Sequence, residues 1–461
     1  MKFIGRKKEV QAINNLISKN IYQGCIVYGR RRLGKTMLLK HCLLNKDTPC
    51  IFFQCSLDSE ENNTSELTKL IEKELNLNHL YFSRFIDAIK FVFEQSVNTK
   101  IYFTLDEYTY IEKVIPGFDS LLQKIIDEYM HTANISFFLC GSSISSMESI
   151  LSKSNPLYQR FHLSILLQEM DYLDASKFYP NFSNEDKVRF YAAFGGVPFY
   201  LSQINTSLSV KENIINLLSG SYASLCNDIA INLKAEMSKI NNANAIFSVI
   251  SEQKAFHYSD ILSKSHIASS ASLNDILEKL MSMDLIEYIC PINDKNNKHK
   301  SGYIIKDSAT RFYYRYIYNN RSAVAIMDNE TFYNEIINDD FESSLVPKTF
   351  ETIAKQYLIR RNQKGLNNPT LMDIGSYWYD DPLTKTNGQF DVVGKSKNGY
   401  TFYEVKFTKN PINDSIIKEE LSQISKSSLK PVKCGFISRS GFEIKNITNI
   451  ELIELKDIYN I

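Results

Sequence analysis

Residues 29 to 36 have the types and the spacing of a loop that binds phosphate. The glycines at its two ends let the backbone wrap with its N–H groups facing a phosphate that also lies at the start of the next helix. Lys35 would reach the β and γ phosphates, and Thr36 would give a hydroxyl oxygen to Mg²⁺. We therefore predict a nucleoside triphosphate site with ATP and Mg²⁺ as cofactors. The loop follows the apolar run 25–28 and consists of Gly29, Arg30, Arg31, Arg32, Leu33, Gly34, Lys35 and Thr36.

Polar side chains follow two later apolar runs, at the point where each run ends. Asp106 and Glu107 come after the run 101–105, and Ser142 and Ser143 come shortly after the run 135–139. The carboxyl ends of parallel strands face the ligand crevice. We therefore expect Asp106 to hold Mg²⁺ through water, Glu107 to polarise the attacking water, and the serine hydroxyls to sense the γ-phosphate or orient that water. The alternatives are a helix cap for the acidic pair and an ordinary turn for the serines.

Two carboxylates and an amine are expected to converge in the last third of the chain. The strand-like runs 389–394 and 400–406 are joined by an Asn-Gly turn, which is a strong hairpin signal. Glu404 and Lys406 then project from one face, and Asp391 on the paired strand can lie near them. Asp391 and Glu404 would hold Mg²⁺, while Lys406 would orient or help deprotonate a water for phosphodiester cleavage. The alternative is a solvated strand face with an ordinary salt bridge.

The elements that must position these residues follow from the apolar runs. Runs at 25–28, 51–53, 101–105, 135–139 and 163–167 alternate with helix-like stretches, which predicts a parallel sheet with helices on both faces. Residues from about 170 to 235 have a helical pattern. The next segment is typical of a winged helix, because short helices precede the strand-like segments 285–289 and 303–305.

Composition limits the function classes. At 461 residues the chain is too long for a single core, and 53 basic against 52 acidic residues give no global attraction to nucleic acid or anionic membrane. No run approaches the roughly 18 apolar residues of a membrane span, and the first residues do not resemble a signal peptide. We expect a soluble cytoplasmic protein. The eight cysteines and seven histidines are dispersed, which favours reduced core cysteines over a zinc site.

The middle segment could bind DNA or another part of a protein. Basic residues decorate the tip of its predicted wing: Lys295, Lys298, His299 and Lys300. The exposed face of its expected recognition helix, however, carries Asn274, Asp275, Glu278 and Lys279. Acidic groups on that face would repel phosphates in the major groove. We therefore favour a docking role over reading of duplex DNA.

Nearly the whole chain resembles the archaeal-type ATPases of the AAA+/STAND group that carry a C-terminal DUF234 domain. The resemblance rests on the loop 29–36, the acidic pair at 106–107, the segment 141–143, and further matches at 3–6, 156–160 and 195–201. It implies that Gly5-Arg6 lies near the adenine and that the segment 195–201 belongs to a helical lid. Arg160 matches a recurrent arginine that would contact the γ-phosphate, in cis or from a neighbouring subunit. A solvent-facing arginine is the alternative for Arg160.

The resemblance also bears on the last third, because DUF234 is similar to the PD-(D/E)XK nuclease superfamily. It implies that Glu351 is the acidic metal ligand of the first core helix, beside Asp391 and Glu404, and that Gln423 is an auxiliary polar residue. The expected fold is thus α/β, with a P-loop NTPase core of the ASCE type and a restriction-endonuclease-like domain. The expected domains are the ATPase core at 1–168, a helical lid at 169–235, a winged-helix-like domain at 236–325 and the DUF234 domain at 335–461.

The leading functional hypothesis is an ATPase whose nucleotide state controls a nuclease-like domain that acts on or binds nucleic acid, with DNA favoured over RNA. The rival is a STAND-type signalling or scaffold ATPase, which binds a protein partner through its middle and C-terminal domains and cleaves nothing. Oligomerisation is compatible with both hypotheses. A helicase or translocase ranks last, because no further motor motifs follow Asp106-Glu107.

Overall fold

The computed structural model describes residues 3–44, 47–220, 222–238, 240–252, 257–297, 301–381, 386–444 and 450–461. The chain divides into two compact units, Met1–Glu169 and Met170–Ile461. Each unit is described by itself below. Within the described residues, no helix has both the length and the apolar character that a membrane crossing requires.

The first unit is built on a parallel sheet with the strand order β2-β3-β4-β1-β5. All the predicted strand-like runs of this region form strands, which confirms the α/β class. β4 lies between β1 and β3, as expected for the ASCE type of P-loop fold. The strands are β1 (Gln23–Tyr28), β2 (Cys50–Gln54), β3 (Ile101–Asp106), β4 (Ile135–Gly141) and β5 (Leu163–Leu166).

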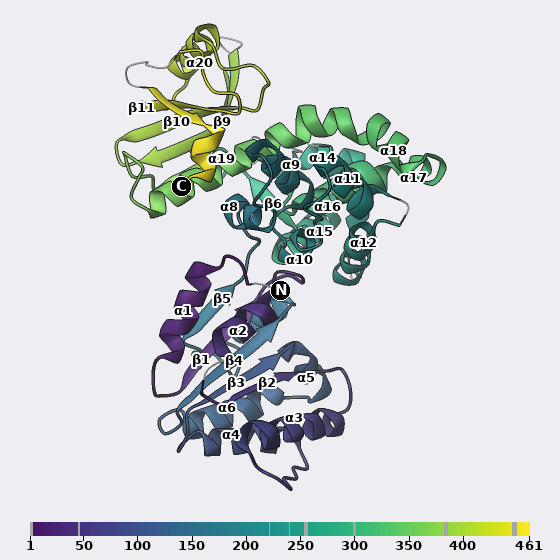
Figure 1. Ribbon diagram of the computed structural model, residues 1–461, viewed down its shortest axis with the longest axis vertical. Coiled ribbons are helices and arrows are strands. Elements are labelled where there is room, and N and C mark those ends of the chain that lie inside the picture. Colours follow the sequence, from purple (N-terminus) through teal and green to yellow (C-terminus); the bar gives the residue numbers. More distant parts are fainter. Residues whose placement is uncertain are drawn as a thin grey trace. The chain divides into compact units, whose positions relative to one another are not determined.

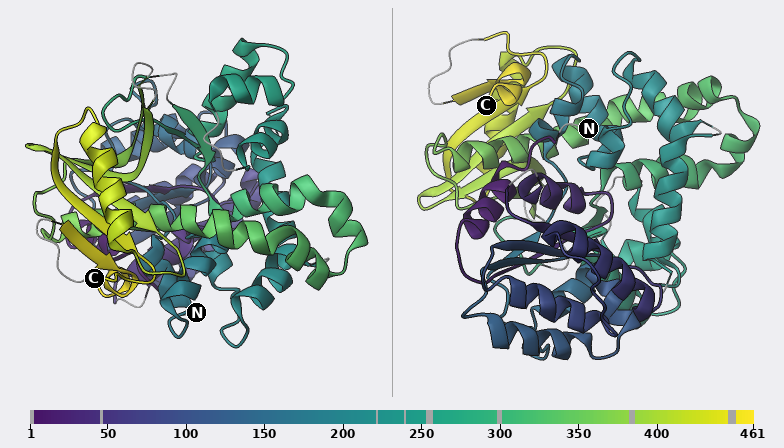
Figure 2. Two further views of the ribbon diagram at one scale, coloured as in Figure 1. Left: turned by 90° about the horizontal axis from the view of Figure 1, so that it is seen from above. Right: turned by 60° about the horizontal axis from the view of Figure 1, so that its bottom comes forward.

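Helices cover both faces of this sheet. Figures 1 and 2 show α1 and α2 on one face and α3, α4 and α6 on the other. Alternate residues of the strands, such as Ile26, Phe103 and Phe137, enter a buried core with these last helices. The helices are α1 (Lys7–Ile17), α2 (Lys35–Leu43), α3 (Glu60–Leu75), α4 (Phe85–Gln95), α5 (Tyr108–Val114), α6 (Phe118–Tyr129) and α7 (Ile144–Ile150).

The second unit begins with short helices in the region of the expected lid. α9 begins at a Ser183 cap and ends at the Gly195-Gly196 break. Gly196 has no room for a side chain, because an ideal Cβ would lie 1.9 Å from the carbonyl oxygen of Met170. The segments are α8 (Tyr172–Ala175), the 3-10 turn η1 (Ser176–Phe178), α9 (Asn184–Phe194), α10 (Pro198–Leu201), α11 (Val210–Ile214), the π-helical η2 (Ile215–Ser219) and α12 (Ser224–Glu236).

The middle of this unit has the helices and the hairpin expected from the sequence. α13 (Ala243–Ile250), α14 (Tyr258–Lys264) and α15 (Ser270–Ser282) precede the antiparallel strands β6 (Ile286–Ile289) and β7 (Gly302–Ile305). On α15 the predicted apolar stripe is buried, and Asn274, Asp275, Glu278 and Lys279 are exposed as expected. The wing residues Lys298, His299 and Lys300 lie outside the described residues.

Further helices lead from this hairpin to the last part of the chain. From Asn329 to Gln363 the backbone is helical without a break, and two π-helical stretches interrupt its α geometry. Figure 2 shows this long helix running up to the C-terminal sheet. The segments are α16 (Ser308–Phe312), the π-helical η3 (Tyr313–Ile317), the 3-10 turn η4 (Tyr318–Asn320), α17 (Arg321–Ile326), α18 (Asn329–Phe332), the π-helical η5 (Tyr333–Asn338) and η6 (Phe341–Leu345), and α19 (Val346–Gln363).

The C-terminal part is a mixed sheet with the order β12-β11-β10-β9-β8. The predicted hairpin is present, since β9 and β10 are antiparallel and turn between Ser396 and Gly399. β10, β11 and β12 are parallel to one another. This sheet is the core of a separate C-terminal β-rich domain, and the expected restriction-endonuclease-like fold stays a prediction. Its elements are β8 (Asp373–Asp381), β9 (Thr386–Ser396), β10 (Gly399–Lys406), α20 (Asp414–Lys426), β11 (Pro431–Ser438), β12 (Ile450–Glu454) and α21 (Leu455–Tyr459).

Candidate nucleotide site and carboxylate–lysine cluster

The loop 29–36 lies between β1 and α2, at the carboxyl edge of the sheet. Gly29 has a φ of +145°, and an ideal Cβ there would lie 2.4 Å from the carbonyl oxygen of Leu167. Gly34 has a φ of +85° and open space around it. Both positions therefore favour glycine, the first for space and backbone conformation and the second for conformation alone.

Lys35 and Thr36 begin α2 and point to the edge of the sheet. The Lys35 ammonium donates hydrogen bonds to the carbonyl oxygens of Gly29 and Arg30, both at 2.9 Å. Burial lowers the pKa of Lys35, while the nearby Glu107 and Asp106 oppose that shift. The Thr36 hydroxyl donates to Oδ2 of Asp106 at 2.7 Å. The structure thus brings together the loop and the acidic residue that ends β3.

Glu107 lies beside Ser142, as the sequence predicted for two strand ends. The Ser142 hydroxyl is 2.8 Å from Oε2 and 3.1 Å from Oε1 of Glu107. Glu107 precedes α5 with a φ of +52°, and among the described contacts its side chain makes no capping bond to that helix. The Ser143 hydroxyl instead lies 2.7 Å from that of Ser146. The capping alternative for Glu107 is therefore not supported. Of the two serines, only Ser142 contacts Glu107 among the described contacts.

The rest of the loop has mixed exposure. Arg31 and Arg32 are exposed, and Leu33 is buried. An Arg31 amino group lies 3.4 Å from the hydroxyl of Tyr110, and Arg6 donates to the carbonyl oxygen of Leu33 at 3.3 Å. The Gly5-Arg6 segment is therefore beside the loop, where the resemblance placed the adenine.

Arg160 lies at the opposite edge of the sheet from the loop. Its carbonyl oxygen accepts a bond from the Tyr22 hydroxyl at 2.9 Å, just before β1 begins. Its guanidinium makes a two-bond pair with Asp127, both contacts at 2.9 Å. β1 runs over Gln23–Tyr28, and a strand of that length separates its two ends by about 17 Å. The expected contact of Arg160 with the γ-phosphate in cis is therefore wrong for this structure, and contact from a neighbouring subunit stays a prediction.

In the second unit, the predicted residues of β10 pair with each other. The Lys406 ammonium donates to Oε1 of Glu404 at 2.5 Å, and it also lies 3.4 Å from Oε1 of Glu420 on α20. Sequence reasoning had pointed to Gln423 on that helix and missed Glu420. Glu351 of α19 forms an ion pair with Lys348, one turn earlier. We call Lys348, Glu351, Lys355, Asp391, Glu404, Lys406 and Glu420 the carboxylate–lysine cluster.

The pKa shifts show that these groups share one partly buried environment. Burial raises the pKa of Glu351 and of Asp391, and the lysines around them oppose both shifts. Burial and the nearby Asp391 raise the pKa of Glu404 to about 8. Burial lowers the pKa of Lys355, while Glu351 and Asp391 oppose that shift. Asp391 contributes to the raised pKa of both Glu351 and Glu404, so these three carboxylates lie near one another, and their role as shared metal ligands stays a prediction.

Lys355 was missed by sequence reasoning. It lies on α19 one turn after Glu351, and its ammonium donates to the Ser376 hydroxyl at 2.8 Å. The i, i+4 spacing of the two residues on an expected helix was the available signal.

One carboxylate oxygen of the cluster is buried and could bind a cation. Oε2 of Glu404 is buried and has no hydrogen-bond partner among the described residues. However, no group of three or more His, Cys, Asp or Glu side chains in the described part of the chain is arranged to hold a metal ion. The expected metal set of Glu351, Asp391 and Glu404 is therefore not closed in this structure, because Lys348 and Lys406 pair with two of its members.

The eight cysteines are spread over both units, and reduced core cysteines stay the expectation for them. Five of them are buried: Cys25, Cys42, Cys50, Cys55 and Cys140. Cys25 and Cys140 lie within β1 and β4.

The parallel sheet, the loop after β1 and the acidic residue ending β3 define a P-loop ATPase domain. Residues 3–204 match the family described as an ATPase domain predominantly from Archaea, and residues 313–424 match DUF234, a family of archaeal and bacterial proteins of unknown function. Residues 3–204 are therefore an archaeal-type ATPase domain and residues 313–424 a DUF234 domain, as the resemblance indicated.

Two relatives and one solved structure are similar to this chain. An uncharacterized protein of Methanocaldococcus jannaschii is 26% identical over 389 residues, which are 82% of each chain. An uncharacterized ATP-binding protein of the same organism is 23% identical over 47% of this chain and 73% of its own. The Walker-type ATPase of Pyrococcus abyssi is similar in structure, with a TM-score of 0.51, 17% identity, and coverage of 68% of this chain and 96% of its own. At that identity the likeness concerns the fold.

Proposed function

We propose that this chain is a Mg²⁺-dependent ATPase whose nucleotide state controls a metal-dependent nuclease site in its C-terminal part. The observation that carries the ATPase half is the meeting of Thr36 with Asp106 and of Glu107 with Ser142. Lys35 would leave its loop carbonyls for the β and γ phosphates, and Thr36 and Asp106 would hold Mg²⁺. Glu107, held by the Ser142 hydroxyl, would take the proton of the attacking water.

The nuclease half rests on the carboxylate–lysine cluster. A divalent cation there would polarise a phosphodiester. Asp391 and Glu404 would hold that cation, and Glu351 would complete the set. The unpartnered Oε2 of Glu404 supports this assignment, since a buried carboxylate oxygen without a partner is costly. Lys406 would then release Glu404 and orient the attacking water.

Control of this site by nucleotide is supported by the start of the second unit. In the first unit, Leu167 donates its N–H to the carbonyl oxygen of Tyr28, directly before the loop. Four residues later in the chain, Asp171 forms an ion pair with Arg360 of α19, the helix that also carries Glu351. Only a few residues of chain thus separate the loop contact at Leu167 from the ion pair that holds α19, the helix that carries Glu351.

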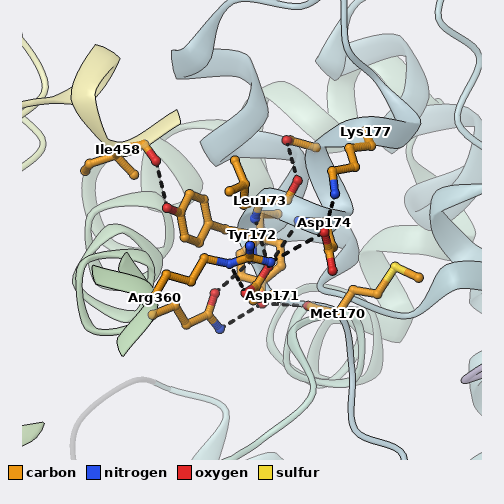
Figure 3. Close-up of polar contacts among 11 residues, drawn as sticks. Met170, Asp171, Tyr172, Leu173, Asp174, Lys177, Arg360 and Ile458 are labelled. Atoms are coloured by element: carbon orange, nitrogen blue, oxygen red, sulfur yellow. Dashed lines mark hydrogen bonds and ion pairs between the residues drawn. The ribbon is translucent and has the colours of Figure 1, made fainter. Parts of the chain in front are cut away.

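Figure 3 shows how firmly this entry segment is held within the second unit. Arg360 contacts Asp171 at 2.7 Å through one amino group, which also lies 3.4 Å from Asp174. The Tyr172 hydroxyl donates to the carbonyl oxygen of Ile458 on α21 at 2.7 Å. The backbone N–H of Tyr172 donates to the side chain of Gln356 on α19 at 2.9 Å. The segment is thereby tied to α19 and to α21.

A specific observation favours the second candidate, a scaffold ATPase that binds a protein partner. The lysines of the cluster already pair with Glu351 and Glu404. Such pairs could satisfy the buried carboxylates permanently, without a metal. The two candidates differ in whether Mn²⁺ or Mg²⁺ binds the cluster.

The test is incubation of the full chain with plasmid, single-stranded DNA and RNA, with and without ATP and Mn²⁺ or Mg²⁺. Asp391→Ala should abolish cleavage and Mn²⁺ binding but keep ATP turnover. Glu443→Ala, at an exposed carboxylate outside the cluster, is the matched control. Arg360→Met should keep Mn²⁺ binding but remove the effect of ATP on cleavage. Absence of both Mn²⁺ binding and cleavage in the wild type would favour the scaffold ATPase.

A further inference from the structure

Asp391 lies in an irregularity of the C-terminal sheet. In the pairing of β8 with β9, Gly375 is opposite Val393, and Tyr377 is opposite Phe390. Two residues of β9, Asp391 and Val392, thus lie opposite the single residue Ser376. This is a β-bulge, which disrupts the ladder locally and re-aims a side chain. The direction of the Asp391 carboxylate therefore depends on what stabilises the bulge.

Ser376 takes part in three hydrogen bonds with different parts of the chain. Its hydroxyl donates to the backbone carbonyl oxygen of Asp391 at 2.9 Å and accepts from the Lys355 ammonium at 2.8 Å. Its own carbonyl oxygen accepts the backbone N–H of Ile292 at 2.9 Å. α19, β9 and the segment after β6 therefore meet at this one residue, and two of its partners belong to the carboxylate–lysine cluster.

The segment that supplies Ile292 belongs to the wing of the middle region. We call residues 291–295, which follow β6, the docked wing. Pro291 forms a parallel bridge with Ser376, so the docked wing extends the edge of the sheet beside β8. Ile292 is 4% exposed and packs in the same core as Tyr377 and Phe390.

Two further contacts fix the docked wing. An ideal Cβ on Gly375 would lie 3.3 Å from Cβ of Ile292, so glycine allows the close approach. Lys295, one of the basic residues at the tip of the predicted wing, forms an ion pair with Asp373 at 2.7 Å. The described part of the wing thus contacts the C-terminal sheet.

We propose that the docked wing positions Asp391 and Lys355 through Ser376, and so sets the metal affinity of the carboxylate–lysine cluster. This inference rests on the proposed metal site. When the wing is in place, Ile292 satisfies the Ser376 carbonyl, and the Ser376 hydroxyl satisfies the Asp391 carbonyl within the bulge. When the wing leaves, the Ser376 carbonyl loses its hydrogen bond from Ile292. The side chains of Asp391 and Lys355 are then no longer held in one orientation. Ser376 is a positioning residue, since it acts through Asp391.

The first test removes the hydroxyl of Ser376. Ser376→Ala should lower the Mn²⁺ affinity of the full chain by about 10-fold or more, the range found for groups that orient metal ligands. Ser376→Thr keeps the hydroxyl and suits a strand, so it should restore most of the affinity. Mn²⁺ binding is measured by calorimetry, with ATP turnover as the check that the protein is folded.

The second test loosens the wing itself. In Gly375→Val the new Cβ has atoms of Ile292 as its nearest neighbours, so the change is aimed at the docked wing. Faster hydrogen exchange at the Ile292 amide would report undocking, and Mn²⁺ affinity should fall with it. Lys295→Glu should act in the same direction by a few-fold, and adding Asp373→Lys should restore binding. The control is the same reversal at the exposed pair Lys279 and Asp275 on α15, whose atoms lie 2.6 Å apart.

The outcomes separate this inference from the proposed site. If the wild type binds Mn²⁺ and Ser376→Ala binds it equally well, the positioning role is wrong while the metal site stands. The same holds if undocking raises Mn²⁺ affinity or cleavage, since the wing would then be inhibitory. If the wild type binds no Mn²⁺, the proposed metal site fails and this inference fails with it.

Discussion

Replacing Ser142 by alanine should slow ATP hydrolysis without weakening ATP binding. The Ser142 hydroxyl lies 2.8 and 3.1 Å from the two oxygens of Glu107, but its single proton makes one bond at a time. A hydrogen bond to a charged group contributes about 1.5–3 kcal/mol, and we take about 1.5 because the pair is only partly buried. At about 1.4 kcal/mol for each factor of ten, Ser142→Ala should lower kcat about tenfold.

Glu107 and Ser142 should act as one unit in catalysis, which a double-mutant cycle can test. Glu107→Gln removes the general base and should cost about 100-fold to 10,000-fold in kcat. Adding Ser142→Ala to Glu107→Gln should then change kcat by less than about twofold, because the hydroxyl has no base left to position. Phosphate release under saturating ATP measures all the variants.

A neighbouring serine gives the matched control. The Ser143 hydroxyl lies 2.7 Å from that of Ser146 and not beside Glu107, so Ser143→Ala should keep the wild-type rate. The reasoning is refuted if Ser142→Ala hydrolyses ATP at the wild-type rate. It is also refuted if the effects of Glu107→Gln and Ser142→Ala simply multiply.

Three further outcomes are expected. Lys35→Ala should lower ATP affinity by about 100-fold or more in a nucleotide titration, because it removes charge-assisted bonds to two phosphates. Gly34→Ala should lower the free energy of unfolding by about 1–2 kcal/mol, because alanine is strained at that positive φ. Gly29→Ala should lower it clearly more, because its Cβ would also meet Leu167. Thermal unfolding measures both variants. Burial alone would raise the pKa of Glu451, but hydrogen-bond donors hold it below its ordinary value of 4.5. Its stabilisation is complete above that value and is lost as pH falls through the lower folded pKa, so Glu451→Gln should destabilise the protein near pH 7 and progressively less as the pH falls through that folded pKa.

The nucleotide site was predictable because each of its parts is local or follows a general rule. The loop 29–36 is contiguous, and parallel strands bring Asp106 and Ser142 to the same edge of the sheet. The contact predicted for Arg160 in cis was wrong because its sequence context does not show which edge of the sheet it occupies. That edge is set by where β5 begins against β1, and a sequence pattern leaves that start undetermined by a few residues.

The carboxylate–lysine cluster was predictable in part. The side-chain period of two placed Glu404 and Lys406 on one face, and the Asn-Gly turn fixed their partner strand. The bulge at Asp391 interrupts that period, so the direction of this carboxylate depends on Ser376 and Ile292. Ile292 comes from a different element far away in the sequence. Such a contact leaves no periodic signal, and the sequence therefore did not show where the wing docks.

In the long helix from Asn329 to Gln363, the number of residues decides which way the side chains of α19 face. Its π-helical stretches at Tyr333–Asn338 and Phe341–Leu345 come directly before α19. An α-helix turns about 100° per residue, so a one-residue deletion that converts a π-helical stretch to α geometry would rotate everything after it by about that angle. Arg360 would rotate away from Asp171, which lies earlier in the chain, whereas Glu351 would keep its partner Lys348 on the same helix. The number of residues in this segment therefore fixes the rotation of α19 about its axis. A single insertion or deletion there should disturb the contacts of α19 more than most substitutions.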